Sequence, residues 1–291
     1  TSKKGTKKES VQVSYQANVS FQNISRKMEM AGVDGLRYSL DAAERPEIGG
    51  TKAGAFILTD EQSYAKAVQW QQTYGKSVKW NDPILYGRDY YYDPGAGGVF
   101  GLRTYDPFKA IVRSWAPTTI HNLSINGRNG STSYNIGIGY TMQNGMNQAA
   151  KKDQFQRYNG SVQLNTEVNK WLKINYGAMY SKRITSYPNA SPTSTADPYL
   201  YLYRWSELMP NGAAENGVLG YGPYEQFHDA ATATLENNFA NVNTGFTLTP
   251  TKDWLINFNY TYNNEENINV RPGTRFYGAD TWQIYAGGMK P

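Results

Sequence analysis

VQVSYQANVSFQN (Val11 to Asn23) is the stretch that decides the fold. Apolar or small residues occupy every odd position from Val11 to Phe21, and uncharged polar residues occupy every even position from Gln12 to Gln22. Side chains alternate across a β-strand with period two, so one face of this strand is apolar and the other is polar. The apolar face must lie against either a protein core or a lipid bilayer.

Composition limits the class of protein. The 291 residues include 28 Gly, 24 Tyr and 7 Trp, and 39% of them are hydrophobic. This mixture is too polar for a helical membrane protein and too aromatic for a disordered chain. No run approaches the roughly 18 consecutive apolar residues that a membrane-spanning helix needs, and no amino-terminal segment has the apolar centre of a signal peptide. A spanning helix is therefore not expected, whereas a spanning barrel is compatible with the sequence.

The net charge of +5 comes partly from a short basic run that contains Lys3, Lys4, Lys7 and Lys8. Such runs usually lie on exposed segments, and no basic stripe continues downstream, so a solvated linker is favoured over nucleic-acid binding. The chain has no Cys and so forms neither a disulfide nor a thiolate site.

Three later pairs of alternating runs predict β-hairpins. The first pair flanks a turn at Gly127 to Gly130, and an Asn-Gly turn between alternating runs is a strong hairpin signal. The second pair turns at Asn169 and Lys170, and the third turns around Pro250 to Asp253. Together with the opening stretch, these runs predict about seven strands.

The connections between these strands alternate in length. Those at about residues 24 to 118, 143 to 153 and 184 to 234 are medium to very long, and the three between them are tight. A soluble sandwich has no reason to place every long connection at one end, whereas outer-membrane barrels have short periplasmic turns and longer extracellular loops. The predicted fold class is all-β, part of a transmembrane antiparallel β-barrel with long extracellular loops.

Lipid is the favoured covering of the apolar faces. No charged residue occupies the apolar face in the central part of any strand, and a charge there costs about 2 to 4 kcal/mol at the bilayer midplane. Twelve residues rise about 40 Å, and at a tilt of about 45° they cover about 28 Å, the thickness of a hydrocarbon core. The residues predicted to face lipid are Val11, Val13, Tyr15, Val19, Phe21, Ile136, Ile138, Tyr140, Ile174, Tyr176, Ile256, Phe258 and Tyr260.

Two Trp residues mark the tight-turn end of the predicted strands. Trp171 and Trp254 each come directly after a tight turn, where the interfacial aromatic girdle of a barrel belongs. Hairpin packing is the alternative interpretation, since aromatic residues are common in any strand.

The long connections carry local signals of their own. Thr59 and Gln62 are spaced as a capping box, and Gly75 follows as a stop, which predicts a short helix between them. Asp93 to Gly98 and Tyr187 to Pro198 are typical of turn-rich loops.

An odd number of strands cannot close a bacterial barrel. The sequence also stops at Pro291, inside what would be another outer loop. We therefore expect the chain to be a fragment of a larger polypeptide, whose further strands complete the barrel.

Several segments resemble the SusC/RagA family of TonB-linked (TonB-dependent) outer-membrane transporters. The opening TSKKGTKKESVQVSYQANVSFQN is similar to that family's junction between the plug domain and the first barrel strand. DPFKAIVRSWAPTTIHN (Asp106 to Asn122), HNLSINGRNGSTSYNIGIGY (His121 to Tyr140) and FQRYNGSVQLNTEVNKWLKI (Phe155 to Ile174) are similar to its early barrel. The resemblance covers most of residues 1 to 185.

The resemblance implies a large plugged barrel. Residues 1–10 would be the end of the plug domain and the plug–barrel junction, and residues 11–291 the N-terminal part of the barrel, incomplete. Family members import oligosaccharides or peptides with energy relayed by TonB, in the outer membrane of Gram-negative bacteria. The implied partners are a SusD-like lipoprotein lid, the TonB complex through a region that this chain lacks, outer-membrane lipid, and a glycan or peptide substrate.

The residues offer little for catalysis. His121 and His228 are the only His residues and lack HExxH spacing, and neither a GxSxG elbow nor a Walker-type loop occurs. Glu265 and Glu266 are adjacent on a strand end and point to opposite faces, which is wrong for a general acid–base pair. We therefore expect no enzyme activity, and no metal or organic cofactor.

Loop aromatics are the candidates for substrate binding: Trp70, Trp80, Tyr90, Tyr91 and Tyr92. Exposed rings stack on sugars or pack against peptide side chains. For any one of these residues the favoured interpretation is nevertheless packing, either between loops or against the lid protein, because interfaces are Tyr-rich whatever the ligand.

Two further hypotheses stay open beside the transporter. In the first, the chain is a soluble or surface-attached all-β module that binds carbohydrate or peptide without transport, and its apolar face meets a second sheet. In the second, an outer-membrane enzyme uses a small barrel, which requires a catalytic constellation elsewhere in the protein.

Overall fold

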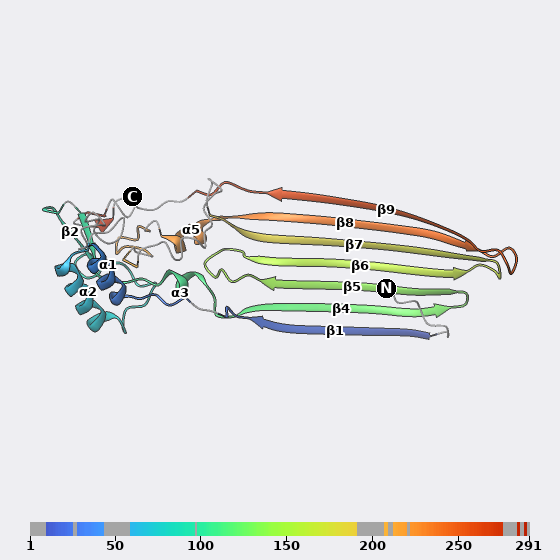
Figure 1. The fold of residues 1–291 in the computed structure, drawn as a ribbon, viewed down its shortest axis with the longest axis horizontal. Coiled ribbons are helices and arrows are strands. Elements are labelled where there is room, and N and C mark those ends of the chain that lie inside the picture. Colours follow the sequence, from blue (N-terminus) through green and yellow to red (C-terminus); the bar gives the residue numbers. More distant parts are fainter. Residues whose placement is uncertain are drawn as a thin grey trace.

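The structure is a computed structural model that describes residues 10–25, 28–43, 59–96, 98–190, 207–208, 212–219, 222–275, 284–285 and 288–289. Its main body is one antiparallel sheet of seven strands in the order β1-β4-β5-β6-β7-β8-β9. These strands run side by side along the long axis of the molecule (Figure 1). The all-β class and the seven strands predicted from the sequence are confirmed.

The strands of this main sheet are β1 (Ser10–Gln22), β4 (Ala116–Asn129), β5 (Thr132–Asn144), β6 (Gln154–Glu167), β7 (Leu172–Asn189), β8 (Ala231–Leu248) and β9 (Ile256–Val270). Two short hairpins stand apart from it, β2 (Tyr90–Asp93) with β3 (Gly98–Gly101) and β10 (Ile284–Tyr285) with β11 (Gly288–Met289). The helices among the described residues are α1 (Val33–Ala43), α2 (Glu61–Tyr74), α3 (Pro107–Ile111) and α5 (Pro223–Asp229). Among the described residues, no helix combines the length and the apolarity needed to cross a membrane.

The register places the alternating apolar residues of all seven strands on one face. A single row of directly opposed residues runs Val13, Ile125, Ile136, Val162, Ala178, Val242 and Tyr262. Directly opposed residues of an antiparallel pair point to the same side of the sheet. Every residue predicted to face lipid therefore lies on this one side, which we call the apolar face.

The apolar face is exposed rather than packed. Val13 is 62% exposed, Ile138 55% and Phe258 51%. No second layer made of described residues covers these side chains. The sheet therefore presents a continuous apolar surface across its whole width, far more than a scatter of single exposed residues.

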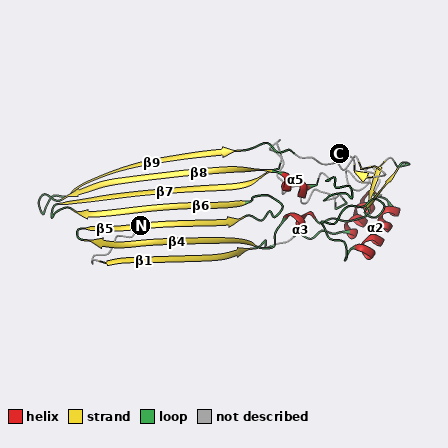
Figure 2. Ribbon diagram, turned by 180° about the vertical axis from the view of Figure 1, so that it is seen from behind, coloured by secondary structure: helices red, strands yellow, loops and turns green. Residues whose placement is uncertain are grey.

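The connections alternate in length as predicted. Residues 130–131, 168–171 and 249–255 join strands at one end of the sheet, and residues 23–115, 145–153 and 190–230 join them at the other. The described helices all lie at the end with the long connections (Figure 2). We call the part of the molecule beyond this end, which holds α1, α2, α3, α5, β2 and β3, the cap.

One tight turn lies later than predicted. Gly127 is paired inside β4, and the hairpin closes at Gly130, whose φ is +55°. A two-residue hairpin turn of this kind needs a positive φ, which glycine adopts without steric cost. The second turn is confirmed, since the Asn169 side-chain oxygen accepts hydrogen bonds from the N–H groups of Trp171 and Leu172, both at 2.9 Å.

The start of α2 corrects the predicted capping box. The N-cap is Asp60 instead of Thr59, and its partner is Ser63 instead of Gln62. The Ser63 N–H donates to Asp60 Oδ1 at 2.7 Å, and the Asp60 N–H donates to Ser63 Oγ at 2.8 Å. Aspartate is a stronger N-cap than threonine, which explains the shift by one residue. Gly75 ends the helix as predicted.

One of the two predicted loops is confirmed and the other is partly wrong. The turn predicted at Asp93 to Gly98 joins β2 to β3, whereas Tyr187 to Asn189 belong to β7 and not to a loop. The rest of that predicted loop, from residue 191 on, lies outside the described residues, as do residues 1–9 of the predicted plug junction.

A buried apolar cluster ties the long connections together at the base of the cap. Ile111 ends α3 and Val112 follows it, Ala149 lies between β5 and β6, and Phe227 lies on α5. Ile24, just after β1, packs against them. Three long connections are therefore held in place by a single cluster.

Replacing Ile111 with Ala tests this cluster. Ile111 is 0% exposed, and truncating such a side chain costs about 2 to 5 kcal/mol. In the full-length protein, we expect the amides near Ala149 and Phe227 to exchange hydrogen much faster. Ile268→Ala is the matched control, because Ile268 is 39% exposed on β9. Equal exchange in the two variants would show that the cluster does not hold the cap.

Candidate functional site

The face opposite the apolar one, which we call the polar face, carries mainly amide and hydroxyl side chains. One row of directly opposed residues on it runs Gln16, Asn122, Gly139, Asn159, Ser181, Phe239 and Glu265. A side-chain amide both donates and accepts hydrogen bonds. This face can therefore bind polar ligands without carrying a large net charge.

Amides on β8 and β9 bond to one another across the strands. Asn241 Nδ2 donates to Asn263 Oδ1 at 2.5 Å. Asn237 Nδ2 donates to Glu265 Oε1 at 2.7 Å and to Asn267 Oδ1 at 2.8 Å. These hydrogen bonds fix the orientation of the amides. Their remaining donors and acceptors are therefore held in defined positions on the polar face.

Two glycines make room for amide side chains of the neighbouring strands on the polar face. A Cβ at Gly177 would lie 2.5 Å from the side-chain oxygen of Asn243, and one at Gly139 would lie 2.5 Å from Nδ2 of Asn159. The absence of a side chain at these two positions therefore lets the amide of the next strand lie flat across the sheet.

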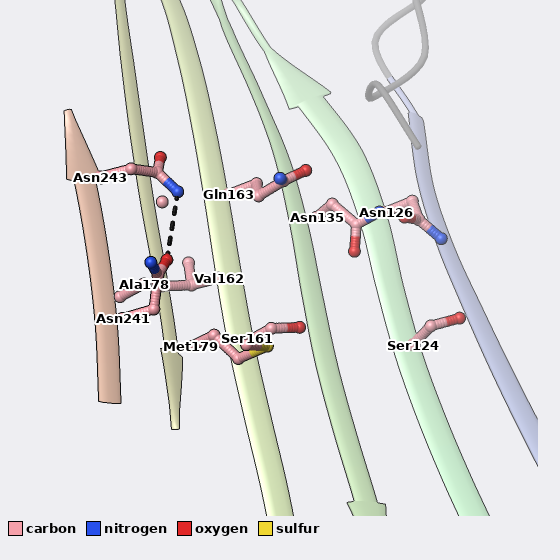
Figure 3. A pocket seen from close by; sticks show the side chains of 11 residues that line it. Ser124, Asn126, Asn135, Ser161, Val162, Gln163, Ala178, Met179, Asn241 and Asn243 are labelled. Carbon is pink, nitrogen blue, oxygen red and sulfur yellow. Dashed lines mark hydrogen bonds between the residues drawn. The ribbon is translucent and has the colours of Figure 1, made fainter. Parts of the chain in front are cut away.

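The polar face is hollowed into a first pocket of about 420 Å³. Ser124 and Asn135 line one side of it, and Asn241 and Asn243 line the other (Figure 3). Asn243 Nδ2 donates to Asn241 Oδ1 at 3.4 Å. The volume falls within the roughly 300–1,000 Å³ of small-molecule sites, and the lining fits a neutral polar ligand.

A second pocket of about 500 Å³ lies nearer the cap on the same face. Its lining includes Arg157 and Arg183, with Glu265 and Phe239. Sequence reasoning missed this pocket, because it arises from the register that aligns residues of four strands, β6 to β9.

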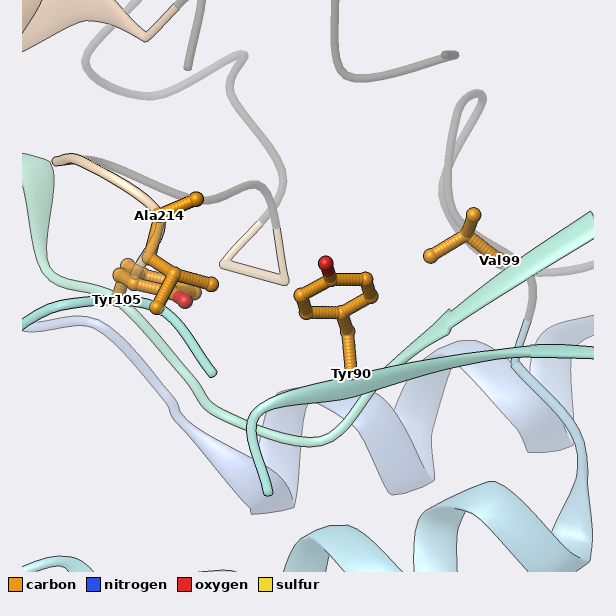
Figure 4. Close-up of a cluster of buried hydrophobic side chains, with 5 residues drawn as sticks. Tyr90, Val99, Tyr105 and Ala214 are labelled. Carbon is orange, nitrogen blue, oxygen red and sulfur yellow. The ribbon is translucent and has the colours of Figure 1, made fainter. Parts of the chain in front are cut away.

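Two of the predicted ring residues are buried inside the cap. Trp70 is 5% exposed and Tyr90 is 4% exposed. Tyr90 packs with Val99, Tyr105 and Ala214 in an apolar cluster (Figure 4). Burial raises the pKa of Tyr90 to about 12. In this conformation Trp70 and Tyr90 hold the cap together, which fits the packing interpretation.

Asp89 organises the charges at the centre of the cap. Its carboxylate accepts a hydrogen bond from Trp70 Nε1 at 2.9 Å and one from Arg88 Nη2 at 2.7 Å. The Leu85 N–H donates to it at 3.0 Å, and Arg103 Nη1 lies 3.6 Å away. A buried carboxylate with this many partners is satisfied internally, so Asp89 has a structural role.

The other predicted ring residues keep part of their surface open. Trp80 is 39% exposed and meets Tyr224 edge-on, with ring centroids 4.8 Å apart. Tyr91 is stacked on Phe100, and Lys66 Nζ lies 4.1 Å from its ring centroid. Tyr92 packs against the cluster of Tyr90. Substrate binding by these aromatics stays a prediction, and Trp80 is the one best placed for it.

The two predicted interfacial Trp residues lie at the tight-turn end of the sheet. Trp171 is 49% exposed and precedes β7, and Trp254 is 66% exposed and precedes β9. Their exposure leaves both rings free to meet an external surface, and their interfacial role stays a prediction.

Glu225 is a buried acid in the cap. It lies on α5 and is 2% exposed. Burial raises its pKa to about 7, although backbone amides of Glu225, Gly212 and Gly222 partly offset the effect, and Asp229 adds to it. This carboxyl is therefore mostly protonated in mildly acidic medium.

Comparisons with known proteins show likeness in structure only. No family model matches the sequence, and no curated protein matches it. A chain of the RagAB peptide transporter matches with a TM-score of 0.50 and 20% identity, over 86% of this chain and 27% of that chain. A chain of the RagAB peptide importer in its open-open state matches with the same values. The likeness shows a shared fold, and this chain spans about a quarter of the length of those chains.

Acidity should stabilise the cap through Glu225. Its folded-state pKa is raised above the unfolded value of 4.5. Its contribution to the stability of the folded cap is therefore fully present below about pH 4.5 and is lost as pH rises through about 7. We expect slower proteolysis of the cap at pH 5 than at pH 8 in the full-length protein. Glu225→Gln should weaken this pH dependence. An unchanged pH profile in that variant would contradict the assignment to Glu225.

Proposed function

We propose that this chain is part of the wall of a SusC/RagA-type β-barrel in the outer membrane of a Gram-negative bacterium. In this proposal the intact protein imports oligosaccharides or oligopeptides, a SusD-like lipoprotein closes its outer face, and the TonB complex supplies the energy. The apolar face meets lipid, the polar face lines the lumen and meets a plug domain, and the cap lies outside the cell. The proposed activity is transport and not catalysis.

The observation that carries the proposal is a slanted apolar band. In β1 the alternating apolar residues run from Val11 to Phe21, with their centre at Gln16. In β9 they run from Ile256 to Tyr262, with their centre at Asn259. The row of directly opposed residues that starts at Gln16 ends at Glu265. The centre of the band therefore moves six residues toward the tight turns as the sheet is crossed.

The slant matches the strand tilt of a membrane barrel. Six residues along a strand correspond to about 20 Å, and six spacings between strands to about 29 Å. The band is therefore inclined by about 35° to the direction across the sheet. Strands of outer-membrane barrels are tilted by about 35–45° from the membrane normal. A flat bilayer would thus cover the apolar residues of every strand at once.

The charges on the apolar face also support the proposal. Lys182 and Glu236 lie on that face, beyond the band on the cap side, and pair at 2.7 Å. Glu266 lies directly opposite Asn238, also beyond the band. Charges therefore begin where the band ends, as a bilayer boundary would require.

The soluble-module alternative requires a different surface. A sheet that meets a second sheet buries its apolar side in a core about 10 Å thick. The described residues place no such layer on the apolar face, where Tyr15 and Tyr262 are 66% and 55% exposed. This exposure favours the membrane barrel over the soluble module.

A pair of lysine substitutions on β9 tests the orientation. Tyr260 lies in the middle of the band and is 56% exposed, and Thr261 is its exposed neighbour on the polar face. A lysine on the lipid side costs about 2 to 4 kcal/mol near the midplane. We therefore expect Tyr260→Lys to reduce heat-modifiable, folded protein in outer membranes severely, and Thr261→Lys to leave it nearly unchanged.

Two results would contradict the barrel. One is equal tolerance of the two lysines, which would mean that neither face meets lipid. The other is full-length protein that stays soluble in the absence of detergent.

Trp80 provides the test of substrate capture. If its open ring packs against the substrate, Trp80→Ala should weaken binding by the full-length transporter about twofold to tenfold. Trp115→Ala is the matched control, because Trp115 is 59% exposed and belongs to none of the predicted sites. Unchanged affinity for the imported oligosaccharide or peptide would leave Trp80 as a packing residue.

A further inference from the structure

Two arginines of the main sheet lack the partners that its other cations have. Arg or Lys occurs at five positions in β1 and β4–β9. Arg128 and Lys173 both pair with Glu167, at 3.7 Å and 3.0 Å, and Lys182 pairs with Glu236 at 2.7 Å. Within the described part of the chain, the guanidinium groups of the remaining two, Arg157 and Arg183, form neither an ion pair nor a hydrogen bond.

These two arginines lie directly opposite each other. Arg157 on β6 and Arg183 on β7 are partners in the register, so their Cβ atoms are about 5 Å apart on the same face. Like charges in this arrangement repel each other and destabilise the pairing of the strands. Both side chains are exposed, so this unpartnered pair is open to a ligand of opposite charge.

The surroundings restrict the ligand. Both arginines line the second pocket of the polar face, together with Glu265, Phe239 and Met179. Two guanidinium groups and one carboxylate leave a local charge of about +1. A single carboxylate matches this charge, whereas Glu265 would repel the larger charge of a phosphate dianion. The guanidinium fork binds a carboxylate through two parallel hydrogen bonds.

We infer that Arg157 and Arg183 form a carboxylate-binding site on the lumen side of the sheet. Phe239 and Met179 offer apolar contact to the group that bears the carboxylate. The carboxylate comes either from an acidic substrate in transit or from a segment of the same protein that fills the barrel. The lumen location rests on the proposed function, whereas the binding of a carboxylate rests on the register and the pocket.

Uptake of two peptides distinguishes these sources. The probes are a hexapeptide with blocked ends and two aspartates, and the same peptide with two asparagines. Cells make the full-length protein together with its partner lipoprotein and TonB, and mass spectrometry measures uptake. If the substrate supplies the carboxylate, the unaltered protein prefers the acidic peptide, and Arg157→Gln or Arg183→Gln lowers that preference about tenfold. Arg157→Lys, which keeps the charge, lowers it less.

Thermal melting of the purified full-length protein tests whether a segment of the same protein supplies the carboxylate. If a segment of the protein supplies the carboxylate, uptake shows no preference, and Arg157→Gln lowers the melting temperature by several degrees because that carboxylate loses its partner. Arg271→Gln is the matched control for both measurements, since Arg271 is exposed just past β9 and outside both pockets.

The inference is overturned if Arg157→Gln changes neither uptake preference nor melting temperature, or if it raises the melting temperature with no change in preference. The second result would mean that removing the charge only relieves repulsion at an empty site. If the unaltered protein imports neither peptides nor oligosaccharides, the proposed function fails, whereas melting still decides whether the arginines hold a carboxylate.

Discussion

The register of the seven-stranded sheet is the constraint on which the rest of the structure depends. Side chains alternate with period two, so a slip of one residue between two strands would move one strand's apolar set to the polar face. From β1 to β9 no such slip occurs, and the row from Val13 to Tyr262 is apolar or small throughout. The tight turns maintain this register, through the positive φ of Gly130 and the side-chain bonds of Asn169.

The same register builds the features of the polar face. It sets Gly177 beside Asn243, so that an amide can lie across the sheet, and it sets Arg157 opposite Arg183. The long connections depend on the sheet in a different way. The cluster around Ile111 and Phe227 holds them at the ends of the strands, so the cap is anchored to the strand ends. One sheet therefore specifies an apolar face, a polar face and a base for the cap.

Local sequence patterns predicted the strands well, because each strand carries its own period-two signal. They predicted less where a choice depended on distant residues. Gly127 and Gly130 both follow an asparagine, and only the pairing of β4 with β5 selects the second as the turn. The sequence around Trp70 and Tyr90 does not indicate burial, because their partners are distant in sequence. Trp70 donates a hydrogen bond to Asp89, and Tyr90 packs against the cluster that contains Ala214. The arginine pair joins residues 26 positions apart and becomes visible only once β6 and β7 are aligned.

The different lengths of the strands have a consequence for the shape of the opening. In β1 the apolar band ends at Phe21, next to the strand's last residue, Gln22. In β7 it ends at Tyr180, whereas the strand continues for nine residues to Asn189. At the proposed tilt those residues rise about 25 Å above the hydrocarbon. In the proposed barrel, the rim would therefore be level with the membrane at β1 and would stand well above the lipid headgroups at β7 and β8. A lid that rests on such a rim would have to sit at an angle to the membrane.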